Sequence, residues 1–262
     1  MNMIDTTHRA MDADATSERG VSAELRELSA KLSAMSGLAE AQLTAAIDAL
    51  AARDTELAER VVAGDAAIDD LETDINARAM GMLTRHAPVA ADLREIVAAL
   101  KISSNIERIG DYAANIAKRA VIVNGYGQVP AATGVIELGH LVRQYTQTVF
   151  DAYVERNVAK AESVWRGDAE IDALHTSVFQ DLLSDMLVEH DYVLPCTHLL
   201  FCIKNLERIG DHATNVAETI QFLVAGTQLA ERRRDKNGRA QERASIPLTT
   251  SMSADFHTGE KP

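Results

Sequence analysis

The chain has 262 residues, of which 47% are hydrophobic and only 4% aromatic, and its formal net charge is −13. This length suffices for one large domain or two modest ones. Before residue 231 there are 19 basic against 34 acidic residues, and such a surplus repels nucleic-acid phosphates. We therefore expect no nucleic-acid partner, and the carboxylates suit cations or basic protein surfaces instead.

No run of alternating β-branched residues lies between turn signals, so the sequence predicts an all-α protein. Cys196 and Cys202 are six residues apart in a predicted helix and point to different faces, which excludes a local disulfide. The sequence shows neither an apolar run long enough for a bilayer nor a signal peptide. We expect a cytoplasmic protein, with at most peripheral membrane association through partners.

The predicted elements begin after a polar stretch, residues 1–19, which has no helical period and is expected to be a mobile leader. From Val21 onward, apolar residues recur at intervals of three and four, which is the amphipathic helix period. A bend is expected at Gly64. The first predicted bundle spans residues 20–123 and has helices at about 21–50, 54–83 and 88–123.

The segment NGYGQVPAATG, residues 124–134, contains Gly and Pro and is predicted to be a linker. A second bundle, residues 135–230, follows, and a bend is expected at Gly167. Its helices are predicted at about 135–156, 158–190 and 195–225. The last residues, 231–262, are rich in basic and poor in apolar side chains, and we predict a disordered tail.

The two halves carry the same motifs. NIERIGDYAANIA at 105–117 is repeated as NLERIGDHATNVA at 205–217, and GDAAIDDL from Gly64 is repeated as GDAEIDAL from Gly167. Because each half is large enough to bury a bundle core, the repeat predicts duplicated domains and not a solenoid. The expected fold is two pseudo-repeated antiparallel three-helix bundles with six long helices.

The repeated motif places polar oxygens on one side of a helix. On a helical wheel Glu107, Asp111 and Asn115 fall within one wedge, opposite the apolar stripe that contains Ile106 and Ile109. The second copy repeats this wedge with Glu207, Asp211 and Asn215. The sequence thus predicts an oxygen-rich strip on the surface of each bundle.

Like charges one helical turn apart repel each other, and this chain keeps that arrangement twice in the same register. A solvated acidic face is the usual explanation for one copy, but two copies favour a bound cation. Carboxylate and amide oxygens suit magnesium, calcium, manganese or iron. Gly110 and Gly210 lie inside these helices, and the close approach of a neighbouring helix would explain them.

The paired ERIGD-x-A-x-N motifs, APVAADLR at 87–94 and the GDAAID/GDAEID pair resemble the PhoU family of phosphate-specific transport accessory proteins. The resemblance extends over roughly residues 21–225. It implies a pair of three-helix bundles whose acidic motifs hold one or more metal ions. It also implies repression of the phosphate-starvation response through contacts with a sensor histidine kinase and with the ATPase of the phosphate ABC transporter, and a homodimer.

Carried over to this sequence, the resemblance assigns the metal ligands to Glu107, Asp111, Glu207 and Asp211. Weaker candidates are Asp69, Asp172, Asn115 and Asn215. The two aspartates occupy matching places in the GDxxID segments, from which they would complete a site across a helix pair. The ions implied are divalent or trivalent, among iron, manganese, zinc and magnesium.

Three classes of function remain open at this stage. The first is a regulator without enzymatic activity, since no phosphate-cradling Gly loop and no nucleophile–base motif occurs. The second is a metal-dependent phosphohydrolase that uses the same carboxylates. The third is a metal-free adaptor whose acidic faces bind basic partner surfaces. Glu137 and His140 form a single E-x-x-H, and without a second copy they do not predict a di-iron site.

Overall fold

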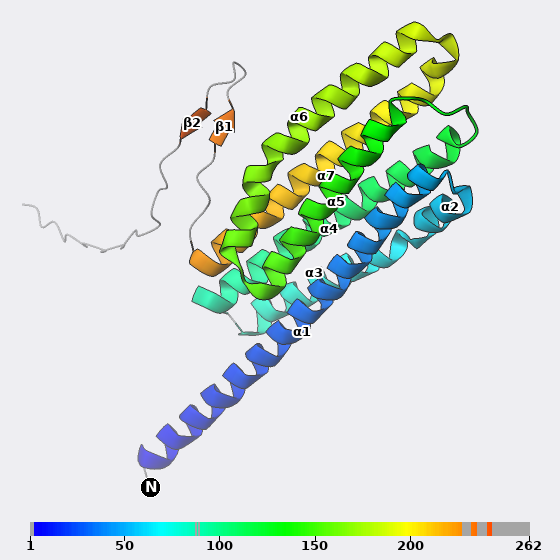
Figure 1. Ribbon diagram of the computed structural model, residues 1–262. Coiled ribbons are helices and arrows are strands. Elements are labelled where there is room, and N and C mark those ends of the chain that lie inside the picture. The colour runs from blue at the N-terminus through cyan, green and yellow to red at the C-terminus, as the bar shows by residue number, and fades with distance from the viewer. Residues whose placement is uncertain (1–2, 87, 89, 227–231, 235–239, 243–262) are drawn as a thin grey trace, which may run out of the picture.

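The protein is described by a computed structural model that covers residues 3–86, 88, 90–226, 232–234 and 240–242. It is helical almost throughout, which confirms the predicted class (Figure 1). No helix in these ranges is both long and apolar enough to cross a lipid bilayer. The elements are α1 (Met3–Ala52), α2 (Thr55–Gly64), α3 (Ala66–His86), α4 (Ala90–Val123), α5 (Ala132–Glu155), α6 (Val158–Val188), the 3-10 helix η1 (His190–Tyr192), α7 (Val193–Ala225), β1 (Arg232–Arg234) and β2 (Ala240–Glu242).

The long helices form two three-helix units that lie against each other (Figure 1). The first unit consists of α1, the α2–α3 pair and α4, and the second of α5, α6 and α7. The two motif-bearing helices, α4 and α7, pack along each other, and α1 also contacts α5. The buried apolar side chains of both units form one continuous cluster. The predicted pair of bundles is therefore confirmed, with a core that they share.

The duplication is visible in the backbone. Arg53 and Arg156 follow the first helix of each unit, and both have a left-handed conformation, with φ of 56° and 54°. The next residue, Asp54 or Asn157, caps the following helix by accepting a backbone N–H from three residues on, at 2.9 Å and 3.1 Å. Residues 103 positions apart are thus structural equivalents in the first two helices of each unit.

The equivalent second helices differ in continuity. In the first unit the helix ends at Gly64 and resumes at Ala66, which agrees with the bend predicted there. In the second unit α6 continues through Gly167 without a break. A tyrosine ring packs directly on Gly167, as described below.

The chain ends differ from the sequence prediction. Helix α1 begins at Met3, so residues 3–19 of the predicted mobile leader are helical and extend beyond the bundles in Figure 1. This stretch contains Ala, Met, Arg and Glu, which have high helix propensity. A helix can therefore form there without the apolar period on which the prediction was based. In the predicted disordered tail, β1 and β2 pair antiparallel. The remainder of 231–262 lies outside the described residues.

The two motif glycines mark the closest approach of neighbouring helices. A Cβ atom built on Gly110 would lie 2.8 Å from Cδ1 of Ile68 on α3. On Gly210 it would lie 3.0 Å from Cδ1 of Ile171 on α6. Both isoleucines are almost completely buried. Close helix approach, expected from the sequence, is therefore the reason for glycine at both positions.

We expect Gly110→Ala to be less stable than the matched control Gly37→Ala by about 1–3 kcal/mol. Both positions are helical, so the gain in helix propensity is the same, but only Gly110 faces a buried side chain; Gly37 has open space. Urea unfolding monitored by circular dichroism measures the difference. Equal stability of the two variants would show that the helix contact tolerates a methyl group.

Candidate metal centre

The motif carboxylates lie along the line where α3 meets α4. Glu107 and Asp111 are one turn apart on α4, with side chains that are only 15% and 34% exposed. They were predicted to lie on an open surface strip. The approach of α3 covers them in part, which makes their environment less polar than the helical wheel alone indicated.

Asp69 joins the two motif residues from the facing helix. Carboxylate oxygens of Asp69, Glu107 and Asp111 all lie within 4.8 Å of one another. Asp69 follows Ile68 in the sequence, and Ile68 is the side chain that packs on Gly110. The helix contact therefore holds a carboxylate of α3 opposite the motif of α4, as the weaker sequence hypothesis for Asp69 anticipated.

Burial and neighbouring carboxylates raise the pKa values of Glu107 and Asp69 in the first unit. Partial burial, with Asp111 as the next cause, raises the pKa of Glu107 to about 7. The nearby carboxylates Glu72 and Asp69 act in the same direction. The pKa of Asp69 is also raised, by burial and then by Asp65 and Asp111. A positive ion placed among these oxygens would lower all of these pKa values.

One basic side chain of the protein, Arg108, contacts two of these carboxylates. The guanidinium of Arg108 lies 3.3 Å from Glu107 and 3.1 Å from Asp111. This contact opposes the rise in the pKa of Glu107 but does not cancel it. Since Arg108 is half exposed, its pairing with the two carboxylates is screened by water.

The second acidic face is built in the same way on α6 and α7. Burial and then Glu207, with smaller contributions from Asp168 and Asp172, raise the pKa of Asp211 to about 6. Lys204 lies 2.5 Å from Glu207 and opposes this rise. Among the described residues, no second group of three carboxylates reaches the 4.8 Å separation found in the first unit.

The other sequence candidates make contacts of their own. Asn115 accepts a long hydrogen bond of 3.5 Å from Lys118, and the backbone carbonyl of Asn215 accepts one of 2.8 Å from Thr219. His212, next to Asp211, turns toward α4 instead, where its Nδ1 lies 2.8 Å from Oδ1 of Asn105. These contacts give no independent support to the asparagines as ligands.

Three carboxylates that were not among the predicted ligands also act on the two acidic faces. Asp65 and Asp168 are the aspartates of the repeated Gly-Asp pairs, and Glu72 lies three residues after Asp69. Each influences the pKa of a candidate ligand. The helical spacing of Asp65, Asp69 and Glu72 was a signal for them, because residues three and four apart share a helix face.

The donor set of the first unit fits a metal ion. Three carboxylates from two helices converge, and further carboxylates add negative charge around them. Hard and borderline cations such as magnesium, manganese and iron prefer such oxygen ligands. The three carboxylates are oxygen donors of the kind that the sequence analysis expected, and they come from two facing helices.

Comparisons with known proteins agree with this architecture. The PhoU domain matches residues 32–120 and 135–220, one copy for each unit. The chain is 42% identical over 207 residues to a protein of Rhizobium meliloti and 44% identical over 211 residues to one of Caulobacter vibrioides. Both are named phosphate-specific transport system accessory protein PhoU homolog. The matches cover 78% and 80% of this chain and 87% and 92% of the relatives.

Two crystal structures are similar to the protein. PhoU from Pseudomonas aeruginosa has a TM-score of 0.77 at 33% identity, over 79% of this chain and 99% of that chain. The phosphate transport system regulatory protein PhoU from Streptococcus pneumoniae has a TM-score of 0.72 at 25% identity, over 80% and 99%. The two domain matches, the relatives and the shared fold lead to one conclusion: the chain belongs to the PhoU family.

Proposed function

We propose that the protein regulates phosphate uptake and represses the phosphate-starvation response. In this proposal it acts through contacts with a sensor histidine kinase and with the ATPase of the phosphate ABC transporter, as a homodimer in the cytoplasm. The names of the relatives support a role beside the phosphate transporter, and the similar protein from Streptococcus pneumoniae is named a regulatory protein.

A metal ion on each acidic face is part of the same proposal. The observation that carries it is the convergence of Asp69, Glu107 and Asp111 within 4.8 Å, together with the raised pKa of Glu107. In the second unit Glu207 and Asp211 would hold the ion, with Asp172 from the facing helix. An ion bound there would neutralise the carboxylates and tie neighbouring helices together at the surface on which a partner docks.

The convergence of Asp69, Glu107 and Asp111 also suits a second candidate, a metal-dependent phosphohydrolase. In this candidate the same carboxylates would hold catalytic ions. Turnover of a phosphate ester that is lost in Glu107→Gln would favour this candidate. The regulator remains the better supported function, because the relatives are named accessory and regulatory proteins.

Purified wild-type protein is expected to carry metal in near-stoichiometric amount. A variant with Glu107 and Glu207 changed to Gln and Asp111 and Asp211 changed to Asn should lose it, because neutral amides bind cations far more weakly. Inductively coupled plasma mass spectrometry on untagged protein measures the content. Circular dichroism verifies that the variant is folded.

The matched control changes Glu59 and Glu137 to Gln, since both are exposed glutamates outside the motifs. This variant should retain the metal. A wild type that stays metal-free even after incubation with manganese, iron or zinc would contradict the metal proposal. The acidic faces would then be assigned to a metal-free contact with basic partner surfaces.

The raised pKa of Glu107 predicts a pH-dependent stability. Between the ordinary pKa of 4.5 and about 7 the folded state holds the proton of Glu107 more strongly than the unfolded chain. This contribution to stability is therefore lost as the pH rises through that window. Glu107→Gln has no such group, so its stability relative to wild type should increase with pH and level off above about 7.

Urea unfolding in the presence of chelator, at a series of pH values, measures the free energy of unfolding of the wild type and of the variant. Saturating manganese should stabilise the wild type more than the variant at neutral pH, because only the wild type keeps all the carboxylates of the first face. Parallel curves for the two proteins would show that the environment of Glu107 does not penalise its charge.

Deletion of the protein should derepress a phosphate-starvation reporter in phosphate-rich medium. Wild-type protein should restore repression, and the Glu107→Gln, Glu207→Gln double variant should restore it only in part if both reach the same level in the cell. Reporter fluorescence and immunoblotting measure the two quantities. Unchanged reporter output in the deletion strain would contradict the regulatory proposal.

A further inference from the structure

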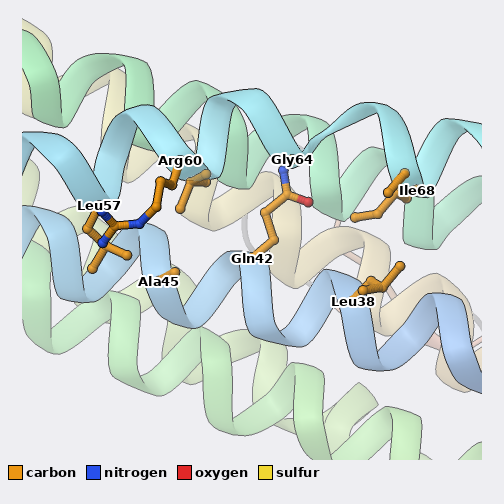
Figure 2. Close-up of a pocket in the computed structure, with 9 residues that line it drawn as sticks. Leu38, Gln42, Ala45, Leu57, Arg60, Gly64 and Ile68 are labelled. Atoms are coloured by element: carbon orange, nitrogen blue, oxygen red, sulfur yellow. The ribbon is translucent and has the colours of Figure 1, made fainter.

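A cavity of about 240 Å³ opens between α1 and the α2–α3 pair of the first unit. Figure 2 shows Gln42 reaching from α1 toward Gly64, with Leu57 and Arg60 on one side and Leu38 and Ile68 on the other. The walls are mostly apolar. Leu38 follows the apolar period of its helix, yet it is 42% exposed at this cavity.

The second unit also has a hollow at the equivalent place, of about 660 Å³, but there a tyrosine ring covers the glycine. The residue 103 positions after Gln42 is Tyr145, and the residue 103 positions after Gly64 is Gly167. A Cβ atom built on Gly167 would lie 2.2 Å from ring atoms of Tyr145. The ring thus rests on the glycine, and its hydroxyl donates a 2.8 Å hydrogen bond to Glu170.

In the first unit the same glycine faces empty space. No side-chain or backbone atom of another element lies within 4 Å of a Cβ built on Gly64. Gln42 is shorter than tyrosine, and its Nε2 is held by a 2.9 Å hydrogen bond to Oδ1 of Asp65. Both units therefore have a position for an aromatic ring over the equivalent glycine, Gly64 or Gly167, which we call a seat. A ring of this chain occupies only the seat at Gly167.

The size and chemistry of the open seat fit a ring. An apolar cavity of about 150 Å³ is enough to bind benzene, and this one is larger. The counterpart of Glu170 is Ala67, so the wall offers no acceptor for a hydroxyl at that point. The counterpart of Ser163 is Arg60, whose guanidinium is able to cover the face of a ring.

The surroundings of the seat are acidic. A shallow hollow on α1 adjoins the cavity, shares Ala45 and Leu57 with it, and contains Glu40 and Asp48. Within the described residues neither carboxylate has an ion-pair partner. A lysine or arginine next to an inserted ring would find complementary charge there.

We propose that the Gly64 seat is a docking site for a partner protein, which inserts an aromatic side chain flanked by basic residues. The ring takes the position that Tyr145 occupies in the second unit, between Arg60 and the apolar walls, and the flanking cations meet Glu40 and Asp48. Buried aromatic anchors of this kind contribute much of the binding energy in protein interfaces. None of the candidate metal ligands lines the seat, although Ile68 of its wall also packs on Gly110.

The test uses the full chain with labelled Ile, Leu and Val methyl groups and the peptide acetyl-Lys-Phe-Lys-amide as probe. We expect saturable shifts of the methyl resonances of Leu38, Leu57 and Ile68 at millimolar peptide. Replacement of Phe by Ala in the peptide should abolish them. Glu40→Gln combined with Asp48→Asn should weaken binding several-fold, since these residues meet the lysines.

Two variants close the seat from opposite walls. Gln42→Tyr supplies the missing ring from within, and Gly64→Leu fills the space from α2; each should weaken peptide binding at least about tenfold. The matched control, Tyr145→Gln, should open the second seat and add peptide-dependent shifts at Ile171. Two-dimensional methyl spectra establish whether each variant is folded.

The proposal fails if the wild type shows no saturable shifts, or if folded Gln42→Tyr and Gly64→Leu bind the peptide as well as wild type does. It also fails if p-cresol alone saturates the same methyl groups with the affinity of the peptide. In that case the seat takes a small aromatic molecule and not a protein segment.

Discussion

The contact between Ile68 and Gly110 determines the distance between α3 and α4, and the acidic site depends on that distance. Only glycine lets the buried isoleucine approach this closely, because a Cβ at position 110 would lie 2.8 Å from its terminal methyl group. Asp69 is the next residue along α3, so the apolar contact also fixes a carboxylate opposite Glu107 and Asp111. The glycine of the motif thus allows the close helix contact that places the acids of the motif beside the facing helix. In the second unit, Ile171 makes the same contact with Gly210.

The duplication preserves backbone features more faithfully than side-chain packing. The left-handed Arg53 and Arg156 and the caps that follow them are equivalent in both conformation and hydrogen bonding. Between the same helices, however, one unit holds a tyrosine ring on Gly167 and the other leaves Gly64 uncovered. A continuous helix accompanies the filled position, and an interrupted helix accompanies the open one. The two units therefore share a fold while offering different surfaces to a partner.

Much of this architecture was predictable from local sequence. The amphipathic period predicted six long helices, and the Gly- and Pro-containing segment at 124–134 placed the connection between the units. The amphipathic period did not predict the start of α1, because this helix begins in polar residues. For the site, helical spacing predicted the faces of Glu107 and Asp111 but not their partial burial. Burial depends on how α3 crosses α4. This is a tertiary contact, and the helical wheel of a single helix gives no information about it.

The two acidic faces are equivalent in position but not in electrostatics. In the first, Arg108 contacts both motif carboxylates, and the position three residues after Asp69 is Glu72. In the second, Lys204 contacts Glu207, and the position equivalent to Glu72 is His175. Each face thus carries a cation from the chain itself, which offsets part of the repulsion without removing it, since the pKa of Glu107 and that of Asp211 both remain raised. Two ions bound at these faces would meet different charge and different ligands, so equal affinity is not expected even though the motif is repeated.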